Sequence, residues 1–358
     1  MKQKIKTVLK IFGVLIGAAL VFAVLLVGWL TITEYKPEPV KAFPVSLSLP
    51  EEPKATVIGE PLRVLTFNIG YCNLGKESDF FMDGGKNVRN GDKELVLKNL
   101  EGVTEIINEA EADVVFIQEA DFDSTRSFGV DSYYGLRDSY GGRFAGALNY
   151  KCDFVPYPFP PIGKVRSGII TNSNLDMVVS KRISLPCSFS WPVSAANLKR
   201  CLLVTYINIE GTDKQLVTVN LHLEAYDNGE GKIAQTKMLW EVLESEYAKG
   251  NYVIAGGDFN QTFPGAIGKY PLKDPDFWTP GVLSEDDLPE GWNYVFDGET
   301  PTCRLLNAPY NPDDGSAQYY VIDGFIISPN VELVSAETLD CGFEFSDHNP
   351  VIMEIVLK

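Results

Sequence analysis

Histidine is scarce in this sequence, and its cysteines lack the spacing of a metal site. Only two histidines, His222 and His348, occur in 358 residues. Both lie at the ends of apolar segments, so we expect acid–base or phosphate chemistry from them. The alternative is that two histidines fell by chance in polar strand ends. The six cysteines contain no C-x-x-C pair, which argues against a structural zinc site; they are Cys72, Cys152, Cys187, Cys201, Cys303 and Cys341.

Basic side chains are also few, once the N-terminus is set aside. Residues 1–30 contain four lysines and no acidic residue, which leaves 27 basic and 48 acidic side chains in residues 31–358, a formal charge of −21. A charge of this sign argues against a broad electrostatic grip on nucleic acid, although a local basic patch stays open. It also suits a soluble extracellular domain.

The N-terminus resembles a membrane anchor. A basic tail, residues 1–10, precedes an uncharged run of twenty residues, 11–30. Twenty residues of helix span about 30 Å, the thickness of a bilayer core. We expect a single-pass signal-anchor with a cytoplasmic N-terminus, because lysines precede the run. A cleaved signal peptide is the alternative, and both readings place the remainder outside the cytoplasm, where an even number of cysteines permits disulfides as well as free thiols.

Residues 31–61 are predicted to form an extended spacer, because six prolines interrupt any periodic pattern. From residue 62 to residue 358 the pattern predicts one α/β domain. We expect helices over residues 93–110 and 232–247, the second with Ile233, Trp240, Leu243 and Tyr247 on its inner face. We expect strands over residues 62–67, 114–117, 167–171, 177–180, 202–209, 215–223, 252–256, 319–327 and 351–357. Mixed hairpins and strand–helix–strand units indicate two packed sheets flanked by helices.

Polar side chains occur at or near the end of six apolar segments. If these ends meet, one pocket holds four carboxylates, two amides and two imidazoles. They belong to Asn68, Glu119, His222, Asp258 with Asn260, Asp323, and Asp347 with His348.

This set of side chains suits the hydrolysis of a phosphoester. Mg²⁺ (or Mn²⁺) takes oxygen ligands, so Glu119 is the best candidate, with Asn68 and Asp347 beside it. Two further pairs and one histidine complete the assignment. Asp258 and Asn260, two apart in an extended chain, are expected to face one side and to handle water and phosphate; Asp323 is expected to hold His348; and His222 is expected to stabilise the phosphate in the transition state.

The ordered motifs resemble those of the endonuclease/exonuclease/phosphatase superfamily. They are Leu65-Thr-Phe-Asn68, Ile117-Gln-Glu119, Asn220-Leu-His222, Gly257-Asp258-Phe-Asn260, Ile322-Asp323 and Ser346-Asp347-His348. The resemblance covers residues 62–357 and implies a four-layer α/β sandwich with metal-dependent phosphoester hydrolysis. It also implies that Glu119 binds the metal and that Asn68 and Asp347 support it. The superfamily includes deoxyribonuclease-like enzymes and neutral sphingomyelinases.

Departures from the subfamily patterns narrow the substrate. Ile69-Gly70-Tyr71 follows the first asparagine where abasic-site endonucleases carry an acidic residue, and Val321-Ile-Asp-Gly324 replaces the cysteine-containing segment of inositol-polyphosphate 5-phosphatases. Relatives place substrate-side residues where this chain has Arg143, Asn149 and Lys164, which are candidates for phosphate binding.

We therefore expect a monomeric, membrane-anchored phosphoesterase with a lipid or small-molecule substrate. An extracellular nuclease and a non-catalytic binding domain of the same fold are the alternatives. A further expectation concerns the proline- and aromatic-rich segment 153–161, which is either a bilayer-facing loop or an ordinary surface connection.

Overall fold

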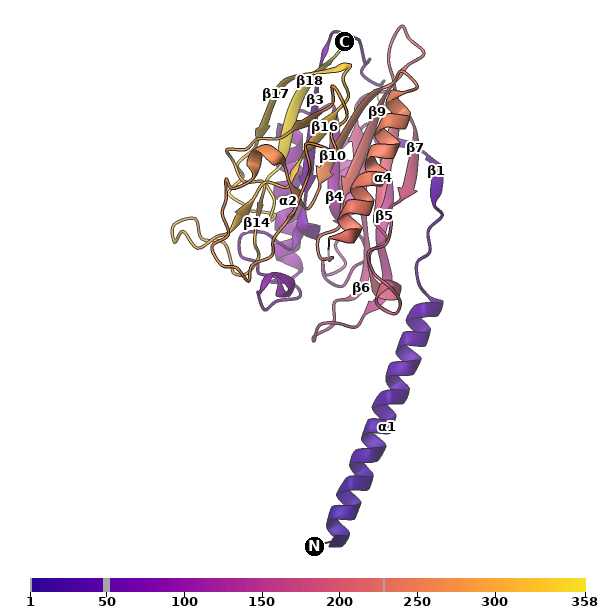
Figure 1. Ribbon diagram of the computed structural model, residues 1–358, viewed down its shortest axis with the longest axis vertical. Coiled ribbons are helices and arrows are strands. Elements are labelled where there is room, and N and C mark those ends of the chain that lie inside the picture. Colours follow the sequence, from indigo (N-terminus) through magenta and orange to yellow (C-terminus); the bar gives the residue numbers. More distant parts are fainter. Residues whose placement is uncertain (1, 48–51, 228) are drawn as a thin grey trace.

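Two seven-stranded sheets form the centre of the computed structural model, which describes residues 2–47, 52–227 and 229–358 (Figure 1). In the first sheet the strand order is β1 (Val40–Pro44), β7 (Met177–Ser184), β8 (Cys201–Asn208), β9 (Gln215–His222), β10 (Tyr252–Asp258), β16 (Asp323–Ile327) and β13 (Asn293–Val295). In the second it is β17 (Val331–Thr338), β18 (Val351–Leu357), β3 (Pro61–Asn68), β4 (Val114–Asp121), β6 (Gly163–Ser173), β5 (Arg143–Val155) and β2 (Ser46–Leu47).

Four α-helices and several short elements complete the described part of the chain. The helices are α1 (Lys2–Ile32), α2 (Lys93–Glu109), α3 (Ser132–Tyr140) and α4 (Glu230–Tyr247). Two small strand pairs are β11 (Gln261–Thr262) with β12 (Gly281–Val282), and β14 (Cys303–Arg304) with β15 (Tyr319–Tyr320). Short 3-10 helices are η1 (Gly70–Cys72), η2 (Phe81–Asp83), η3 (Val193–Ala196) and η4 (Pro264–Ala266).

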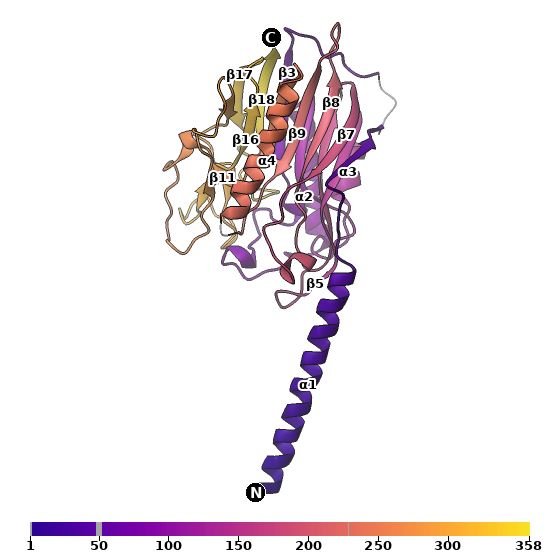
Figure 2. The same cartoon turned by 45° about the vertical axis from the view of Figure 1, so that its right-hand side comes forward.

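Three hydrophobic clusters define four layers. One cluster lies between the sheets and includes Phe116 of β4 and Phe325 of β16. A second lies between the first sheet and α4, and a third between the second sheet and helices α2 and α3. Figures 1 and 2 show α4 over one sheet and α2 on the side of the other. The predicted four-layer α/β sandwich is therefore confirmed.

Local sequence explains the central elements. Strand β4 begins with the apolar run Val114–Ile117, and these residues are buried because β4 lies between β3 and β6 and under helices on its outer face. Helix α2 begins where the side chain of Asp92 accepts a hydrogen bond from the backbone N–H of Leu95, a normal N-cap. Its buried Val96, Val103 and Ile107 recur at helical spacing and pack on that sheet.

The structure differs from the predicted elements in three places. Residues 319–327, predicted as one strand, form β15 and β16, which belong to different sheets. Ile233, predicted on the inner face of α4, is 70% exposed, because the buried face of the helix is centred on Gln235, Leu239 and Leu243 and Ile233 lies to one side of it. Strands β5 and β17 and helix α3 were not predicted, since their apolar residues alternate with charged or small ones.

The proline-rich segment 31–61 lies against the domain for part of its length. Strand β1 pairs with β7, β2 pairs with β5, and Lys54 forms an ion pair of 2.6 Å with Asp113. Residues 40–47 therefore extend both sheets, where prolines alone suggested a spacer. The prediction for residues 48–51 lies outside the described residues.

Helix α1 is longer than the predicted span 11–30 and projects from one end of the domain (Figure 1). Among the described residues it is the one helix long and apolar enough to cross a membrane, by length and composition. Its last turns contact the domain: Leu30 is buried, and Leu26 packs beside it in a cluster with Tyr150, Val155 and Val165.

Candidate active site

Strand pairing brings the predicted polar strand ends together. In the first sheet Asp258, the last residue of β10, lies opposite His222 of β9 and Asp323 of β16. In the second sheet Asn68 ends β3 beside Gln118 of β4, so that Glu119 follows at the same edge. Strands β3 and β4 are parallel, as are β9 and β10, so in each sheet the carboxyl ends of these two strands lie at the same end of the sheet. The ends of the two sheets that carry these residues lie against each other.

Asp258 lies at the centre of this cluster. Its Oδ2 accepts a hydrogen bond of 3.0 Å from Asn68 Nδ2, and its Oδ1 accepts one of 2.8 Å from the backbone N–H of Asn260. The Nε2 atoms of His222 and His348 lie 3.5 Å and 3.8 Å from Asp258 Oδ2. Two imidazoles therefore face one carboxylate oxygen. Burial, followed by the charge of Asp323, raises the pKa of Asp258 to about 7.

His348 is held by Asp323. Its Nδ1 lies 2.8 Å from Asp323 Oδ2, and both side chains are buried. Burial alone lowers the pKa of His348, but the charge of Asp323 outweighs it and the pKa lies well above the ordinary value. The predicted pair is thus formed in the structure, and it favours the charged imidazole.

His222 has the opposite electrostatic environment. Burial, followed by the charge of Arg200, lowers its pKa well below the ordinary value. Its Nδ1 is buried without a hydrogen-bond partner among the described residues, and its Nε2 lies 3.9 Å from Glu119 Oε1. The surroundings therefore favour the neutral form of the His222 imidazole and the charged form of the His348 imidazole, which gives the two rings different capacities.

Glu119 and Asp347 border the same cluster. Glu119 Oε1 lies 3.4 Å from Asn68 Nδ2, and Asp347 Oδ2 lies 4.0 Å from His348 Nε2. Glu119 has a positive φ of 58°, a conformation that costs energy in a non-glycine residue and is concentrated at functional sites. Gly70 leaves room here, since a Cβ at this position would lie 2.7 Å from Asp347 Oδ1.

These oxygen donors fit a hard divalent cation. Burial raises the pKa of Asp347 to about 7, and the charge of Glu119 adds to this increase. A cation between the two carboxylates would relieve that repulsion. Two other groups of three residues have ligand atoms that all lie within 4.8 Å of one another. They are Asp258–Asp323–His348 and Cys303–Asp347–His348. In the second set, burial raises the pKa of the Cys303 thiol to about 12, so it supplies no thiolate at neutral pH.

Asn260 is placed by a turn, where the sequence suggested an extended chain. Its φ is 50°, and its Nδ2 donates a hydrogen bond of 2.9 Å to the carbonyl of Leu223. Its backbone N–H donates to Asp258 Oδ1, so the contact of Asn260 with the cluster is made by the backbone, while its side-chain amide holds the end of β9. The expectation that residues 258 and 260 share one side of a strand does not describe this geometry.

The three candidate phosphate-binding residues do not join this cluster in the same way. Arg143 pairs in register with Ser173, which lies opposite Val114, so it is at the far end of the sheet from Glu119, and it forms an ion pair of 3.1 Å with Asp176. Lys164 lies at the near end and forms an ion pair of 2.6 Å with Asp123. Asn149 is buried at the level of Gly168, near the end of β4. Arg143 therefore lies too far along the sheet to bind a phosphate at this cluster.

Several residues that sequence reasoning missed support the cluster. Gln118 donates a hydrogen bond of 2.8 Å to Asn220 Oδ1, and Asn220 Nδ2 donates to the carbonyls of Ile117 and Ile170. Because Asn220 and Gln118 belong to different sheets, these bonds fix one sheet relative to the other. Both residues stand inside the quoted motifs, so their position next to Glu119 and His222 was the available signal.

Arg126 and Tyr71 form a second supporting group. The Arg126 guanidinium lies 3.9 Å from the Tyr71 ring centroid and makes two hydrogen bonds to Asp121. Burial raises the pKa of Tyr71, whose hydroxyl has no hydrogen-bond partner among the described residues. The sequence carries no pattern that identifies either residue.

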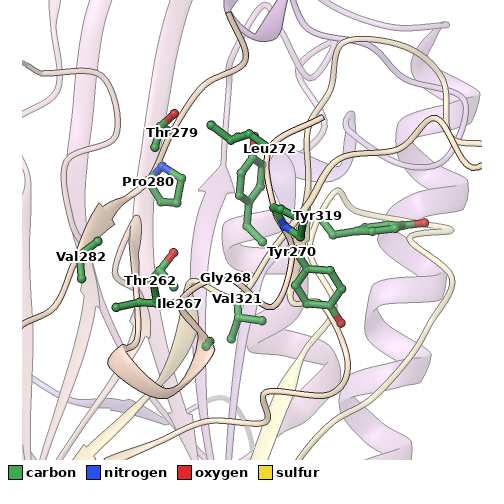
Figure 3. Close-up of a pocket in the computed structure, with 13 residues that line it drawn as sticks. Thr262, Ile267, Gly268, Tyr270, Leu272, Thr279, Pro280, Val282, Tyr319 and Val321 are labelled. Atoms are coloured by element: carbon green, nitrogen blue, oxygen red, sulfur yellow. The ribbon is translucent and has the colours of Figure 1, made fainter. Parts of the chain in front are cut away.

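Two further observations concern the surroundings. All six cysteines are described and carry free thiols. A cavity of about 210 Å³ lies between residues 262–282 and β15, lined by apolar and tyrosine side chains such as Ile267, Leu272 and Tyr319 (Figure 3). None of the eight clustered residues lines it.

Two packed mixed sheets bring carboxylates, amides and two imidazoles together where their carboxyl ends meet, and the four-layer α/β sandwich they form is the fold class of the endonuclease/exonuclease/phosphatase proteins. A family profile described as "Endonuclease/Exonuclease/phosphatase family" matches residues 65–348. The chain therefore belongs to the endonuclease/exonuclease/phosphatase family, whose members are generally phosphoesterases and nucleases.

Individual relatives support the same fold. Tyrosyl-DNA phosphodiesterase 2 of Gallus gallus is 29% identical over 164 residues, which cover 42% of this chain and 40% of that protein. An endonuclease/exonuclease/phosphatase of Beutenbergia cavernae DSM 12333 superimposes with a TM-score of 0.58 at 18% identity, covering 83% of this chain and 72% of that chain. One from Bacteroides vulgatus gives 0.52 at 16% identity, covering 84% and 100%.

Proposed function

We propose that this chain hydrolyses a phosphoester at the cluster around Asp258. The observation that carries the proposal is the placement of His222 Nε2 and His348 Nε2 within 4 Å of one Asp258 oxygen, with Asn68 and Glu119 adjacent. Acid–base groups, amide donors and carboxylates in one buried site are what an in-line attack by water on phosphorus requires.

The hydrogen bonds support the following roles for these residues. Asp258, fixed by Asn68 and by the Asn260 backbone N–H, orients the attacking water and accepts its proton. The imidazolium of His348, held by Asp323, and the neutral ring of His222 present N–H groups to phosphate oxygens. Charge that develops on those oxygens in the transition state is stabilised by donors that are already in position.

A resident Mg²⁺ (or Mn²⁺) fits beside these groups. Glu119, with Asn68 and Asp347 as supporting oxygen donors, would hold it. When bound, the ion neutralises phosphate charge and stabilises the leaving oxygen.

The proposed location is the outer face of a membrane. Helix α1 supplies the candidate anchor, and the lysines that precede its uncharged run favour a cytoplasmic N-terminus. The formal charge of −21 on residues 31–358 favours a lipid or small phosphorylated substrate over nucleic acid.

The test uses the full chain in detergent with Mg²⁺. Substrates are bis-(p-nitrophenyl) phosphate, p-nitrophenyl phosphate, phosphatidylcholine, sphingomyelin and plasmid DNA. We expect His222→Gln and His348→Gln to lower kcat about 10²- to 10⁴-fold with folding retained. Arg143→Ala, at the far end of the sheet, is the control and keeps its activity.

Two outcomes contradict the proposal. Folded protein that is inactive on every substrate would favour a binding domain of the same fold. Hydrolysis of DNA alone would favour the nuclease over the lipid or small-molecule esterase.

A further inference from the structure

The end of the domain that carries the active site is also the end from which α1 leaves. Hairpin 156–162, between β5 and β6, extends beyond the carboxyl end of β4: Ser167 is level with Asp121, and Gly163 is four residues further out. Four residues of strand are about 13 Å. Figure 1 shows α1 joining this end, with the C-terminus at the opposite one.

Helix α1 is fixed against this hairpin and its neighbours. Leu26 and Leu30 pack with Val155 and Ile162, which flank or lie in the hairpin, and with Ala195 of η3. The indole N–H of Trp191 donates a hydrogen bond of 2.9 Å to Thr31 Oγ1. The direction of the helix is therefore set by the domain rather than by a free linker.

The length of the uncharged run brings the domain to the membrane. A bilayer core of about 30 Å requires about 20 helical residues, and the uncharged run 11–30 has that length. Residues 26–30 lie in that run and also contact the domain. The run can cross the bilayer core and keep these contacts only when the part of the domain packed on Leu26 and Leu30 lies at the lipid interface.

The side chains at this end suit such an interface. Phe159 is 96% exposed, Tyr157 73% and Trp191 62%, and Val193 is also exposed. Aromatic side chains are enriched at membrane–water interfaces. Transfer of a large exposed ring from water to such an interface is favourable.

Three basic side chains near these loops are paired with carboxylates. Arg166 binds Asp153, Lys164 binds Asp123, and Lys199 binds Glu34. With an acidic domain behind them, these pairs give no attraction to anionic lipid. Contact with the bilayer therefore depends on insertion of apolar groups and suits zwitterionic headgroups.

A chain of contacts connects this surface with the active site. Tyr157 packs on Phe81 of η2, with ring centroids 6.0 Å apart. Two residues on, Asp83 accepts a hydrogen bond of 2.8 Å from the Tyr226 hydroxyl. Asp83 also accepts a hydrogen bond of 3.3 Å from the backbone N–H of Leu306, and the backbone N–H of Arg304 donates one of 3.0 Å to the carbonyl of Asp347, so η2 is linked to the active site.

We propose that Tyr157, Phe159, Trp191 and Val193 form a membrane-contacting surface that seats the domain on the bilayer crossed by α1. Seated in this way, the site takes the phosphodiester of a zwitterionic membrane lipid. The substrate part rests on the proposed function, and the surface itself rests on the proposed anchor.

The surface is tested by fluorescence of the full chain reconstituted in phosphatidylcholine vesicles. Phe159→Trp adds an indole at the exposed tip, and Val334→Trp adds one on β17, at the end where Val331 pairs with Leu357. With acyl-brominated phosphatidylcholine we expect the emission added at residue 159 to fall about two-fold or more, as for a group 5–10 Å deep in the interface. The emission added at residue 334 stays constant. Equal behaviour of the two variants, or quenching that requires anionic lipid, would overturn the surface.

The substrate is tested with Phe159→Ser. Loss of one aromatic side chain inserted in the bilayer weakens the contact with the membrane by about 1.4 kcal/mol or more. Hydrolysis of vesicle phosphatidylcholine or sphingomyelin is therefore expected to fall about ten-fold. Hydrolysis of soluble bis-(p-nitrophenyl) phosphate stays unchanged. A native chain inactive on the soluble diester and on both lipids refutes the proposed function and leaves the quenching result standing. A chain active on the soluble diester and inactive on both lipids refutes the lipid substrate alone.

Discussion

Replacement of Asp323 by asparagine tests whether the charge beside His348 is catalytic. Asp323 is buried, its Oδ2 lies 2.8 Å from His348 Nδ1, and its Oδ1 has no hydrogen-bond partner among the described residues. Asparagine has nearly the same shape and keeps an oxygen for Nδ1–H, so Asp323→Asn removes the charge and little else.

The magnitude follows from the distance. Two unit charges 2.8 Å apart interact by about 6 kcal/mol at an effective dielectric of 20. The amide dipole retains part of this energy, so we expect a loss of about 3–5 kcal/mol from the transition state, or about 10²- to 10⁴-fold in kcat. Folding stability should fall, because His348 loses the buried partner that favours its charge, and the removal of a carboxylate beside Asp258 offsets only part of this loss.

The assay is steady-state hydrolysis of bis-(p-nitrophenyl) phosphate, with thermal unfolding measured on the same samples. The double variant Asp323→Asn/His348→Gln should be little worse than His348→Gln alone, since both residues act as one unit. A kcat within ten-fold of the native value, or losses that multiply in the double variant, would refute the reasoning.

Three other predictions concern the site and the core. Gly257 has a φ of 150°, and a Cβ there would collide with the carbonyl of Leu221, so Gly257→Ala should lower the free energy of unfolding by about 2 kcal/mol or more, measured by denaturant titration. Phe325 is fully buried between the sheets, so Phe325→Ala should cost about 3–5 kcal/mol in the same titration. EDTA should abolish hydrolysis, and Mg²⁺ or Mn²⁺ should restore it, without loss of circular dichroism.

Each of these predictions has a control variant or an outcome that would contradict it. Ile233→Ala, on the exposed face of α4, should change stability by no more than about 0.5 kcal/mol. A cost at residue 233 as large as at residue 325 would contradict the assignment of the inter-sheet core. Undiminished hydrolysis in excess EDTA would contradict the metal requirement, and an unchanged denaturation midpoint for Gly257→Ala would contradict the close approach to Leu221.

Local pattern predicted most of the elements because their signals are local. The strand at residues 351–357 agrees with β18, and the helix at 93–110 agrees with α2 to one residue. Residues 319–327 were predicted wrongly because a continuous apolar run does not report that the chain leaves one pair of strands and joins another sheet. Ile233 was placed wrongly because the buried face of α4 is centred on Gln235, Leu239 and Leu243, and Ile233 lies to one side of that face.

The family, the sandwich class and the identity of the clustered residues were determined by the sequence itself, because the motifs keep their order and type along the chain. Their roles as catalytic and metal-binding groups remain predictions that the assays above address. The strand register decided that Asp258 lies beside His222 and Asp323 and that Arg143 lies at the far end of its sheet. Tertiary packing decided that His348 also faces Asp258 and that α1 leaves from the end that carries the active site. These relations join residues far apart in the chain, and no local pattern of side chains specifies distances between segments that only tertiary packing brings together.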